Sequence, residues 1–276
     1  MQTHKGNIRE MANVSYIRLA YHILIQLIGL YGIFYFVNAS NYAMFIPVLL
    51  IMFLTQFTIY THYHMSITHG TWKFKYKLFD HFFSIVGILM GMGSPIPWAV
   101  IHRLHHKFTD TEDDPHSPTF YGWFLAHFHV WPTPDLMAAR VAKKDLMKEF
   151  SHLMIYNTPT AIGLTAVAAW LAIFGIFGIE GILVTCIGVG LTNTNLGVTN
   201  CWIHRKQEEI SKPSLWLWSL ILGSPEAYFH KEHHEAPYKY SHTKSYFEWH
   251  ARLIEILEKT GLVEIKKGKK FRCLSN

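Results

Sequence analysis

The sequence predicts an all-α integral membrane protein, with four transmembrane helices in two hairpins and a helical cytoplasmic cap that carries a metal site. Three observations predict this fold class. Half of the 276 residues are apolar and only 16% are charged, and the mean hydropathy is +0.13, which is high for an ordinary water-soluble domain. Four long segments contain no Asp, Glu, Lys or Arg. Clusters of histidine lie just beyond or between these segments.

The four expected spans are residues 19–37, 42–60, 159–179 and 182–200. Each approaches the length of about 20 apolar residues that a helix needs to cross the hydrocarbon core. Residues 81–100 are apolar as well, but glycines and prolines interrupt them, which indicates a re-entrant or surface-lying helix. We therefore expect one membrane domain over residues 1–276, with its cap formed by residues 61–158 and 201–276.

The distribution of cations predicts the orientation in the membrane. Short loops rich in Lys and Arg stay in the cytoplasm, and the two predicted hairpin connections carry no cation. Cations lie instead in the N-terminus, the middle and the tail of the chain, at Lys5, Arg9, Arg18, Lys73, Lys75, Lys77, Arg103, Lys107, Lys143, Lys144, Lys266, Lys267, Lys269 and Lys270. We expect a multi-pass protein with both termini and the cap in the cytoplasm. The net charge of +6 suits anionic lipid headgroups and an acidic soluble partner, and no motif supports binding of nucleic acid.

Nine histidines are candidate metal ligands. They are His64, His69, His102, His105, His106, His204, His230, His233 and His234. In both HRLHH and HKEHH the histidines have the i, i+3, i+4 relation, so on a helix they share one face. Imidazole suits iron, zinc and copper. Nine imidazoles exceed what one ion can hold, so we predict two metal ions.

Two further spacings bear on this site. Asn200 and His204 are four residues apart at the end of the last span, and they could offer an amide that holds a water molecule and a ligand. His64 and His69 lie about 140° apart on a regular helix, so the helix must end, kink or widen there if both are to face the metal. Carboxylates that could orient the ligands are Asp110, Asp113, Asp114, Glu226, Glu232 and Glu235. We expect the other ten histidines to lie outside the ligand set, namely His4, His22, His62, His81, His116, His127, His129, His152, His242 and His250.

In order and spacing, HMSITH, HRLHH with the following DTEDDPHSP, NCWIH and HKEHH closely resemble the boxes of the membrane-bound fatty acid desaturases of the delta-9, stearoyl-CoA desaturase type. The resemblance implies a four-span fold, a diiron centre that uses O2, and a narrow bent tunnel for a saturated acyl chain. It also implies that the nine histidines above are the iron ligands, that Asn200 holds a metal-bound water, and that zinc can replace iron in an expressed protein.

The function implied by the resemblance is the introduction of a cis double bond, at the delta-9 position, into a saturated long-chain fatty acyl group. Both acyl-lipid and acyl-CoA substrates stay open, because Val100 and Ile101 stand where animal members carry an Arg-Asp pair that helps to hold coenzyme A. The chain has no HPGG haem motif, so we expect a separate electron donor, ferredoxin or cytochrome b5. The expected membrane is a bacterial inner or thylakoid-type membrane, or the endoplasmic reticulum.

Two alternatives use the same residues differently. A lipid or alkane hydroxylase would share the diiron site and add an oxygen atom to the substrate, whereas a desaturase removes two hydrogens. A non-enzymatic metal carrier would need polar residues along its spans, and the first three predicted spans are nearly all apolar. The sequence does not favour a zinc protease, because no HExxH motif occurs.

Overall fold

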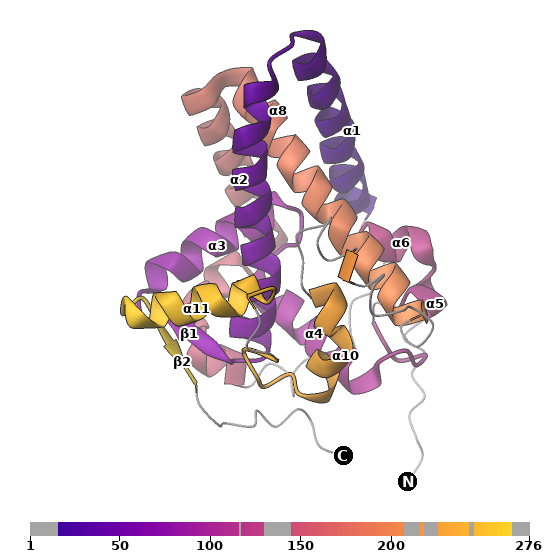
Figure 1. Ribbon diagram of the computed structural model, residues 1–276, viewed down its shortest axis with the longest axis vertical. Helices are drawn as coiled ribbons and strands as arrows, with labels where there is room; N and C mark the ends of the chain where they lie inside the picture. Colours follow the sequence, from indigo (N-terminus) through magenta and orange to yellow (C-terminus); the bar gives the residue numbers. More distant parts are fainter. Residues whose placement is uncertain are drawn as a thin grey trace.

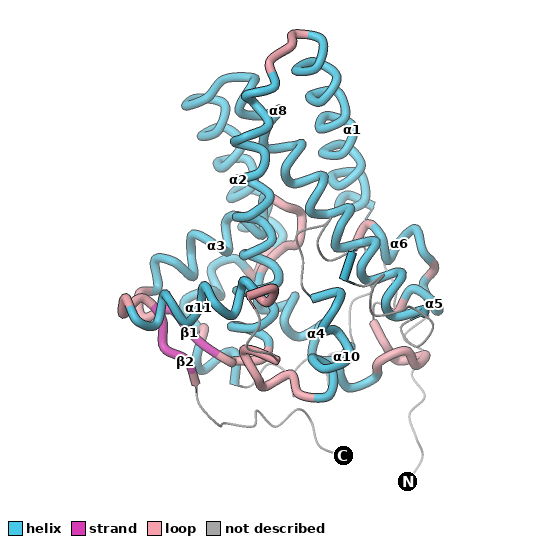
Figure 2. The backbone as a smooth tube through the Cα atoms, in the orientation of Figure 1, coloured by secondary structure: helices cyan, strands magenta, loops and turns pink. Residues whose placement is uncertain are grey.

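A bundle of long helices stands over a group of shorter elements (Figures 1 and 2). This computed structural model describes residues 16–115, 117–129, 145–206, 216–217, 226–242 and 246–266. The bundle consists of α1 (Tyr16–Asn38), α2 (Phe45–Gln56) with the helical turns on either side of it, and α8 (Pro159–Lys206). α8 packs against both α1 and α2. The part of the predicted cap at residues 130–144 lies outside the described residues.

Within the described residues, three helices are long and apolar enough to cross a membrane: Tyr16–Asn38, Tyr42–Thr68 and Pro159–Cys201. Their outward surfaces are apolar: on α1, Leu24 and Leu30 are 54% and 64% exposed, and on α8, Leu171 and Phe174 are 64% and 55% exposed. An apolar surface of this kind is rare on monomers that face water on all sides and is typical of helices that face lipid. The membrane-length helices that we predicted are therefore present, although the third is one long helix where two spans were expected.

Gly178 interrupts this third helix. Its backbone angles are φ 65° and ψ −157°, a conformation that only glycine adopts readily. α8 consequently has two arms that meet at an angle near the end of the bundle farthest from the short elements (Figure 1). The break falls at the end of the predicted segment 159–179, so the sequence located the interruption to within a few residues.

Small residues let the helices of the bundle approach closely. A Cβ atom added to Gly29 of α1 would lie 2.8 Å from the carbonyl oxygen of Cys186 in α8, and one added to Gly188 of α8 would lie 2.6 Å from the side chain of Ile51 in α2. Between α2 and α8, the hydroxyls of Thr55 and Thr192 form a buried hydrogen bond of 2.8 Å. The second arm of α8 is thus held between α1 and α2 by close backbone packing and a polar contact, as is common among helices in lipid.

The extension of α2 is a π-helix, η3 (Phe57–Thr68), and it carries the first histidine box. Its wider turn is closed by i to i+5 hydrogen bonds, including one of 3.1 Å from the His69 N–H to the His64 carbonyl. Residues five apart therefore fall near one another on the same side. The prediction that the helix must end, kink or widen at these two histidines is confirmed, and it widens.

The apolar segment 81–100 is broken where its glycines lie. α3 (Lys77–Leu89) and α4 (Pro95–Phe108) are joined by a short turn in which Gly91 and Gly93 have positive φ, 85° and 74°. Pro95 stands in the first turn of α4, where its missing N–H costs nothing. The turn redirects the chain so that α4 carries the second histidine box beside η3.

Short elements complete the group below the bundle. Among the described residues they are α5 (Pro118–Tyr121), α6 (Trp123–His127), η4 (Ser151–Tyr156), α10 (Glu226–Glu235) and α11 (Trp249–Lys259), with two strands, β1 (Trp72–Phe74) and β2 (Val263–Ile265). The turn η2 (Tyr42–Met44) lies instead at the start of α2, at the opposite end of the bundle (Figure 1). The strands pair antiparallel, with Trp72 opposite Ile265. Trp72, Phe57 and Ile254 of α11 share a buried apolar cluster. The C-terminal elements are thereby fastened to η3, next to the histidines.

We predict that Gly29→Ala destabilises the protein by about 1–3 kcal/mol, the usual cost of an overpacked contact, because the new methyl group meets backbone atoms of α8. Thermal unfolding in detergent micelles measures the loss. Gly163→Ala is the matched control, since a Cβ at this helical glycine meets nothing within 4 Å. Equal stability of the two variants would contradict the close packing of α1 on α8.

Candidate metal centre

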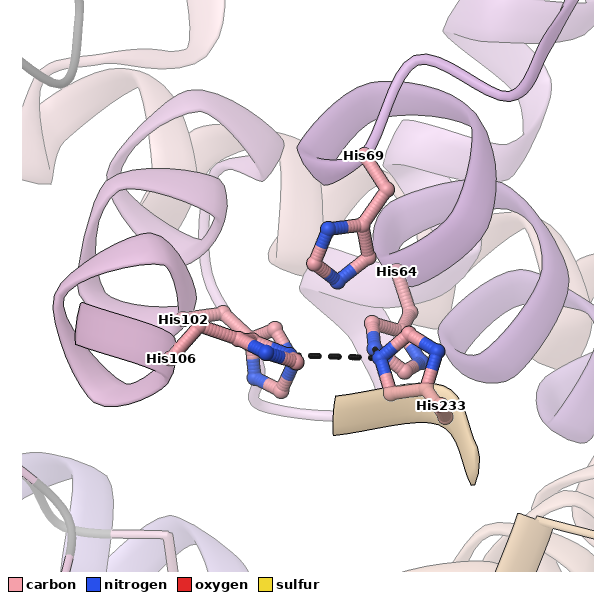
Figure 3. Close-up of side chains that lie close together, drawn as sticks. All are labelled: His64, His69, His102, His106 and His233. Carbon is pink, nitrogen blue, oxygen red and sulfur yellow. Dashed lines mark hydrogen bonds between the residues drawn. The ribbon is translucent and has the colours of Figure 1, made fainter. Parts of the chain in front are cut away.

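Five histidines from three separate elements converge at one buried place. They are His64 and His69 from the end of η3, His102 and His106 from α4, and His233 from α10. One ring nitrogen from each lies within 4.8 Å of the corresponding atoms of the others. Figure 3 shows the five rings pointing toward one another. Members of three of the boxes found in the sequence therefore meet in space.

Neighbouring ring nitrogens lie close to the spacing that they would have around an ion, with one pair slightly closer. His233 Nε2 lies 2.8 Å from His64 Nε2 and 3.2 Å from His106 Nε2, and His102 Nε2 lies 3.1 Å from His106 Nε2. Nitrogens bound to one ion at about 2.1 Å are roughly 3.0–3.4 Å from their neighbours. The buried His69 Nε2 has no hydrogen-bond partner among the described residues. This donor set fits a first-row transition metal.

Burial favours the uncharged form of four of these imidazoles. It holds the pKa values of His69, His102, His106 and His233 well below their ordinary value, and the neighbouring histidines lower them further. A neutral imidazole offers the lone pair that a metal ion needs, whereas a protonated one does not. At neutral pH the cluster therefore presents lone pairs without first having to release protons.

Two side chains of α4 fix the cluster from outside. Arg103 donates from Nε to the carbonyl of Thr68, 2.8 Å away, and from its two terminal nitrogens to the carboxylate of Asp145, at 2.6 and 2.9 Å. It thereby ties α4 to the end of η3. Trp98 stacks on His102 with ring centroids 5.0 Å apart and an 11° angle between the rings. The first two boxes are thus held in register by contacts that do not involve the ring nitrogens.

A second group of predicted ligands lies beside the first. The ring of His234 is 4.2 Å from that of His106, 5.1 Å from that of His105 and 4.6 Å from that of His230, between centroids. His105 is fully buried, and its Nδ1 lies 2.9 Å from the carboxylate of Asp114, also fully buried. Asp114 is one of the six carboxylates that the sequence analysis proposed, and it bonds to a predicted ligand.

The remaining predicted residues are in α8. Asn200 and His204 both lie in its last turns, as expected for the end of a span. The side chain of His204 is outside the described residues, so its place relative to the other histidines stays a prediction.

The described histidines that we left out of the ligand set are also absent from the five-histidine cluster. His62 and His152 face Asp80 instead, at 3.7 and 3.0 Å from its carboxylate oxygens. Burial and the nearby Glu149 raise the pKa of Asp80 to about 7. This group joins η3, α3 and η4 away from the cluster.

His242 is a neighbour of the cluster that sequence reasoning missed. Its ring centroid lies 5.7 Å from that of His233, and its Nδ1 lies 3.3 Å from the carboxylate of Glu248, whose side chain is fully buried. Burial would raise the pKa of Glu248, but hydrogen bonds from the side chain and backbone of His242 outweigh it and leave the pKa below its ordinary value. Because His242 is a single histidine outside the boxes, no spacing in the sequence pointed to it.

An apolar groove of about 660 Å³ lies among α2, α3 and α8. Its lining includes Leu54, Val86, Leu89 and Ile173, and it includes no histidine. The groove is therefore separate from the metal-ligand candidates, and the bent acyl tunnel implied by the resemblance stays a prediction.

The fold and the cluster together define an α-helical protein with membrane-length helices and a buried polyhistidine centre able to hold metal. The chain matches no model of a protein family. It is 28% identical over 195 residues to Delta-9 desaturase-like 1 protein of Arabidopsis thaliana, which covers 66% of this chain and 62% of that protein. It is 30% identical over 212 residues to Acyl-CoA C20 Delta5-desaturase of Anemone leveillei, covering 72% and 66%. Over 99 residues it is 33% identical to Delta-9 acyl-lipid desaturase 1 of Arabidopsis thaliana, covering 35% and 32%.

The chain therefore belongs to the desaturase family, which confirms the resemblance seen in the histidine boxes. It spans less than two thirds of the length of the Arabidopsis relatives.

We predict that the metal-free protein loses stability as the pH falls through about 6.5, the ordinary pKa of histidine. The four imidazoles with lowered pKa values stay neutral in the folded state but take up protons on unfolding. Their contribution to the stability of the fold is therefore full above that pH and is lost below it. Unfolding measured in detergent from about pH 8 to about pH 5 tests this. His106→Gln and His233→Gln should each make the stability less dependent on pH. If the stability of a variant changes with pH as steeply as that of the unmodified protein, the substituted histidine is not one of the neutral buried groups.

Proposed function

We propose that this protein is an O2-dependent desaturase that introduces a cis double bond, at the delta-9 position, into a saturated long-chain fatty acyl group. The observation that carries the proposal is the convergence of His64, His69, His102, His106 and His233 in a chain of the desaturase family. The relatives' names include both acyl-CoA and acyl-lipid desaturases. We accordingly propose a membrane-associated acyl substrate carried either on lipid or on coenzyme A.

We propose that the centre holds two iron ions. The five-histidine cluster would hold one, and His105, His230 and His234 would hold the other with His204 and a water on Asn200. Bound iron would supply the oxidising power, taken from O2, to remove hydrogen from unactivated methylene groups.

The residues of the chain would supply position and a dry environment for this reaction. His64 and His233 are 3% and 2% exposed, so bulk water has little access to the reacting place. A saturated chain has no polar group near the carbons that react, and its position must be set by how deeply it enters. Removal of two hydrogens with reduction of O2 to two waters also needs two electrons and two protons from outside, and we propose ferredoxin or cytochrome b5 as the electron donor.

We further propose that the two arms of α8 are separate spans, which gives four in total. Each arm has close to the ~20 residues that cross a bilayer, and Gly178 provides the turn between them. With four spans, both termini and the histidines would share the cytoplasmic side, where the cations of the middle segment lie.

Expression in cells followed by fatty acid profiling tests the function. We expect monounsaturated acyl groups to accumulate, and we expect His105→Ala and His233→Ala to abolish them while the proteins stay in the membrane fraction. Mass spectrometry of the acyl product distinguishes the two enzymes. A product that has lost two hydrogens supports a desaturase, and a product that has gained an oxygen atom would show a hydroxylase instead. Metal flux without any lipid product would favour a carrier and refute the enzyme.

Asp114→Asn should weaken metal binding by about 10–100-fold, the usual effect of removing an acceptor behind a ligating histidine, because the amide cannot replace the buried carboxylate at His105 Nδ1. Competition with a coloured chelator measures the change. The neighbouring Asp113 is exposed, so Asp113→Asn is the matched control and should leave the affinity unchanged. Equal metal affinities for the two variants would show that Asp114 does not support metal binding.

A further inference from the structure

Two buried nitrogens on neighbouring histidine rings lack hydrogen-bond partners among the described residues. His233 presents Nε2 to the cluster, 2.8 Å from His64 Nε2, and its Nδ1 on the other side of the ring is buried and unpaired. His242 Nε2 is likewise buried and unpaired, in a side chain that is only 7% exposed. A buried polar atom without a partner destabilises the folded protein. Two such atoms on rings 5.7 Å apart therefore point to a contact between them.

Glu248 fixes which nitrogen of His242 carries the proton. Its carboxylate accepts hydrogen bonds from the backbone N–H of His242, at 2.8 Å, and from the hydroxyl of Ser241, also at 2.8 Å. The same carboxylate lies 3.3 Å from His242 Nδ1. Because a carboxylate can only accept, Nδ1 of His242 must be the donor in this bond, and Nε2 is left with a lone pair. A buried acceptor therefore stands beside His233.

A histidine that binds metal through Nε2 keeps its proton on Nδ1 and usually donates it to an acceptor. We infer that His242 is this acceptor, and that His233, His242 and Glu248 form a chain of hydrogen bonds that holds the His233 ring in its metal-binding orientation. The inference rests on the proposed metal-binding function of the cluster. His242 is thus a positioning residue, which acts on the metal through His233.

The rings of His233 and His242 need to move only slightly closer to form this hydrogen bond. Two imidazoles joined by an N–H···N bond of ordinary length have centroids about 5.2 Å apart, roughly half an ångström less than the separation of His233 and His242. The rings are at 82° to each other, so rotation of the His242 ring about its bond to Cβ can direct Nε2 at His233. The arrangement parallels that of Asp114 behind His105, with one imidazole added between the carboxylate and the ligand.

The test uses the full chain in detergent micelles loaded with Co²⁺, whose visible spectrum reports the ligand geometry. We expect His242→Ala to shift this spectrum and to release Co²⁺ to a chelator at least about tenfold faster, in line with the loss of other groups behind ligands. His242→Gln should restore most of the retention, because its side-chain oxygen can accept from His233. Ser241→Ala is the matched control: it removes the hydroxyl that donates to the same carboxylate and accepts from Arg252. It leaves the bonds between His242 and Glu248 in place and should release Co²⁺ as slowly as the unmodified protein.

A further variant separates hydrogen bonding from packing. His242→Phe keeps a ring of similar volume but offers no acceptor, so it should release Co²⁺ as fast as His242→Ala. Slow release from a folded His242→Phe, or release from His242→Gln as fast as from His242→Ala, would overturn the inference. If the unmodified protein binds Co²⁺ and all variants match it, this inference fails while the proposed function stands. If the unmodified protein binds no metal, both fail.

Discussion

The structure is organised by the need to hold five imidazoles together in one buried space. Their nitrogens lie within 4.8 Å of one another, and a proton on one of the buried rings would place a positive charge in a medium of low dielectric constant. The site is stable only while the rings remain neutral and water is kept away. The elements that supply the rings are accordingly tied to one another by contacts that lie outside the cluster.

The π-helix η3 is one consequence of this need. A regular α-helix would turn His64 and His69 to different sides, and the wider winding brings them together at the cost of poorer backbone geometry. Other groups satisfy the carbonyls near its end: the hydroxyl of Thr68 donates to the carbonyl of Tyr63, and Arg103 donates to that of Thr68. Arg103 therefore has two effects, since the bond that completes the backbone of η3 also sets the distance to α4.

The sequence could predict those features that depend on spacing along one element. The i, i+3, i+4 relation placed His102 and His106 on one face of a helix, and the five-residue spacing of His64 and His69 required a distorted helix. It could not choose Asp114 among six nearby carboxylates, nor find His242, because those choices depend on which loops fold back onto the histidines. Gly178 shows the intermediate case: composition located an interruption, but the positive φ that makes the turn is a property of the folded backbone.

Charge explains why the loops fold back in this way. Imidazoles are neutral ligands, so two divalent ions held by histidines alone would bring four positive charges into a buried site with nothing to balance them. Asp114 and Glu248 are both fully buried, and each faces a histidine at the edge of the histidine group rather than its centre. Carboxylates at this distance compensate the charge of the proposed ions without competing with the imidazoles for coordination. They also fix the ring protons on the side away from the metal. Both acids lie in segments that follow a histidine box, Asp114 after the second box and Glu248 after the third. Each carboxylate thus comes from the part of the chain that leaves the histidines, where it can lie beside the group without entering its centre.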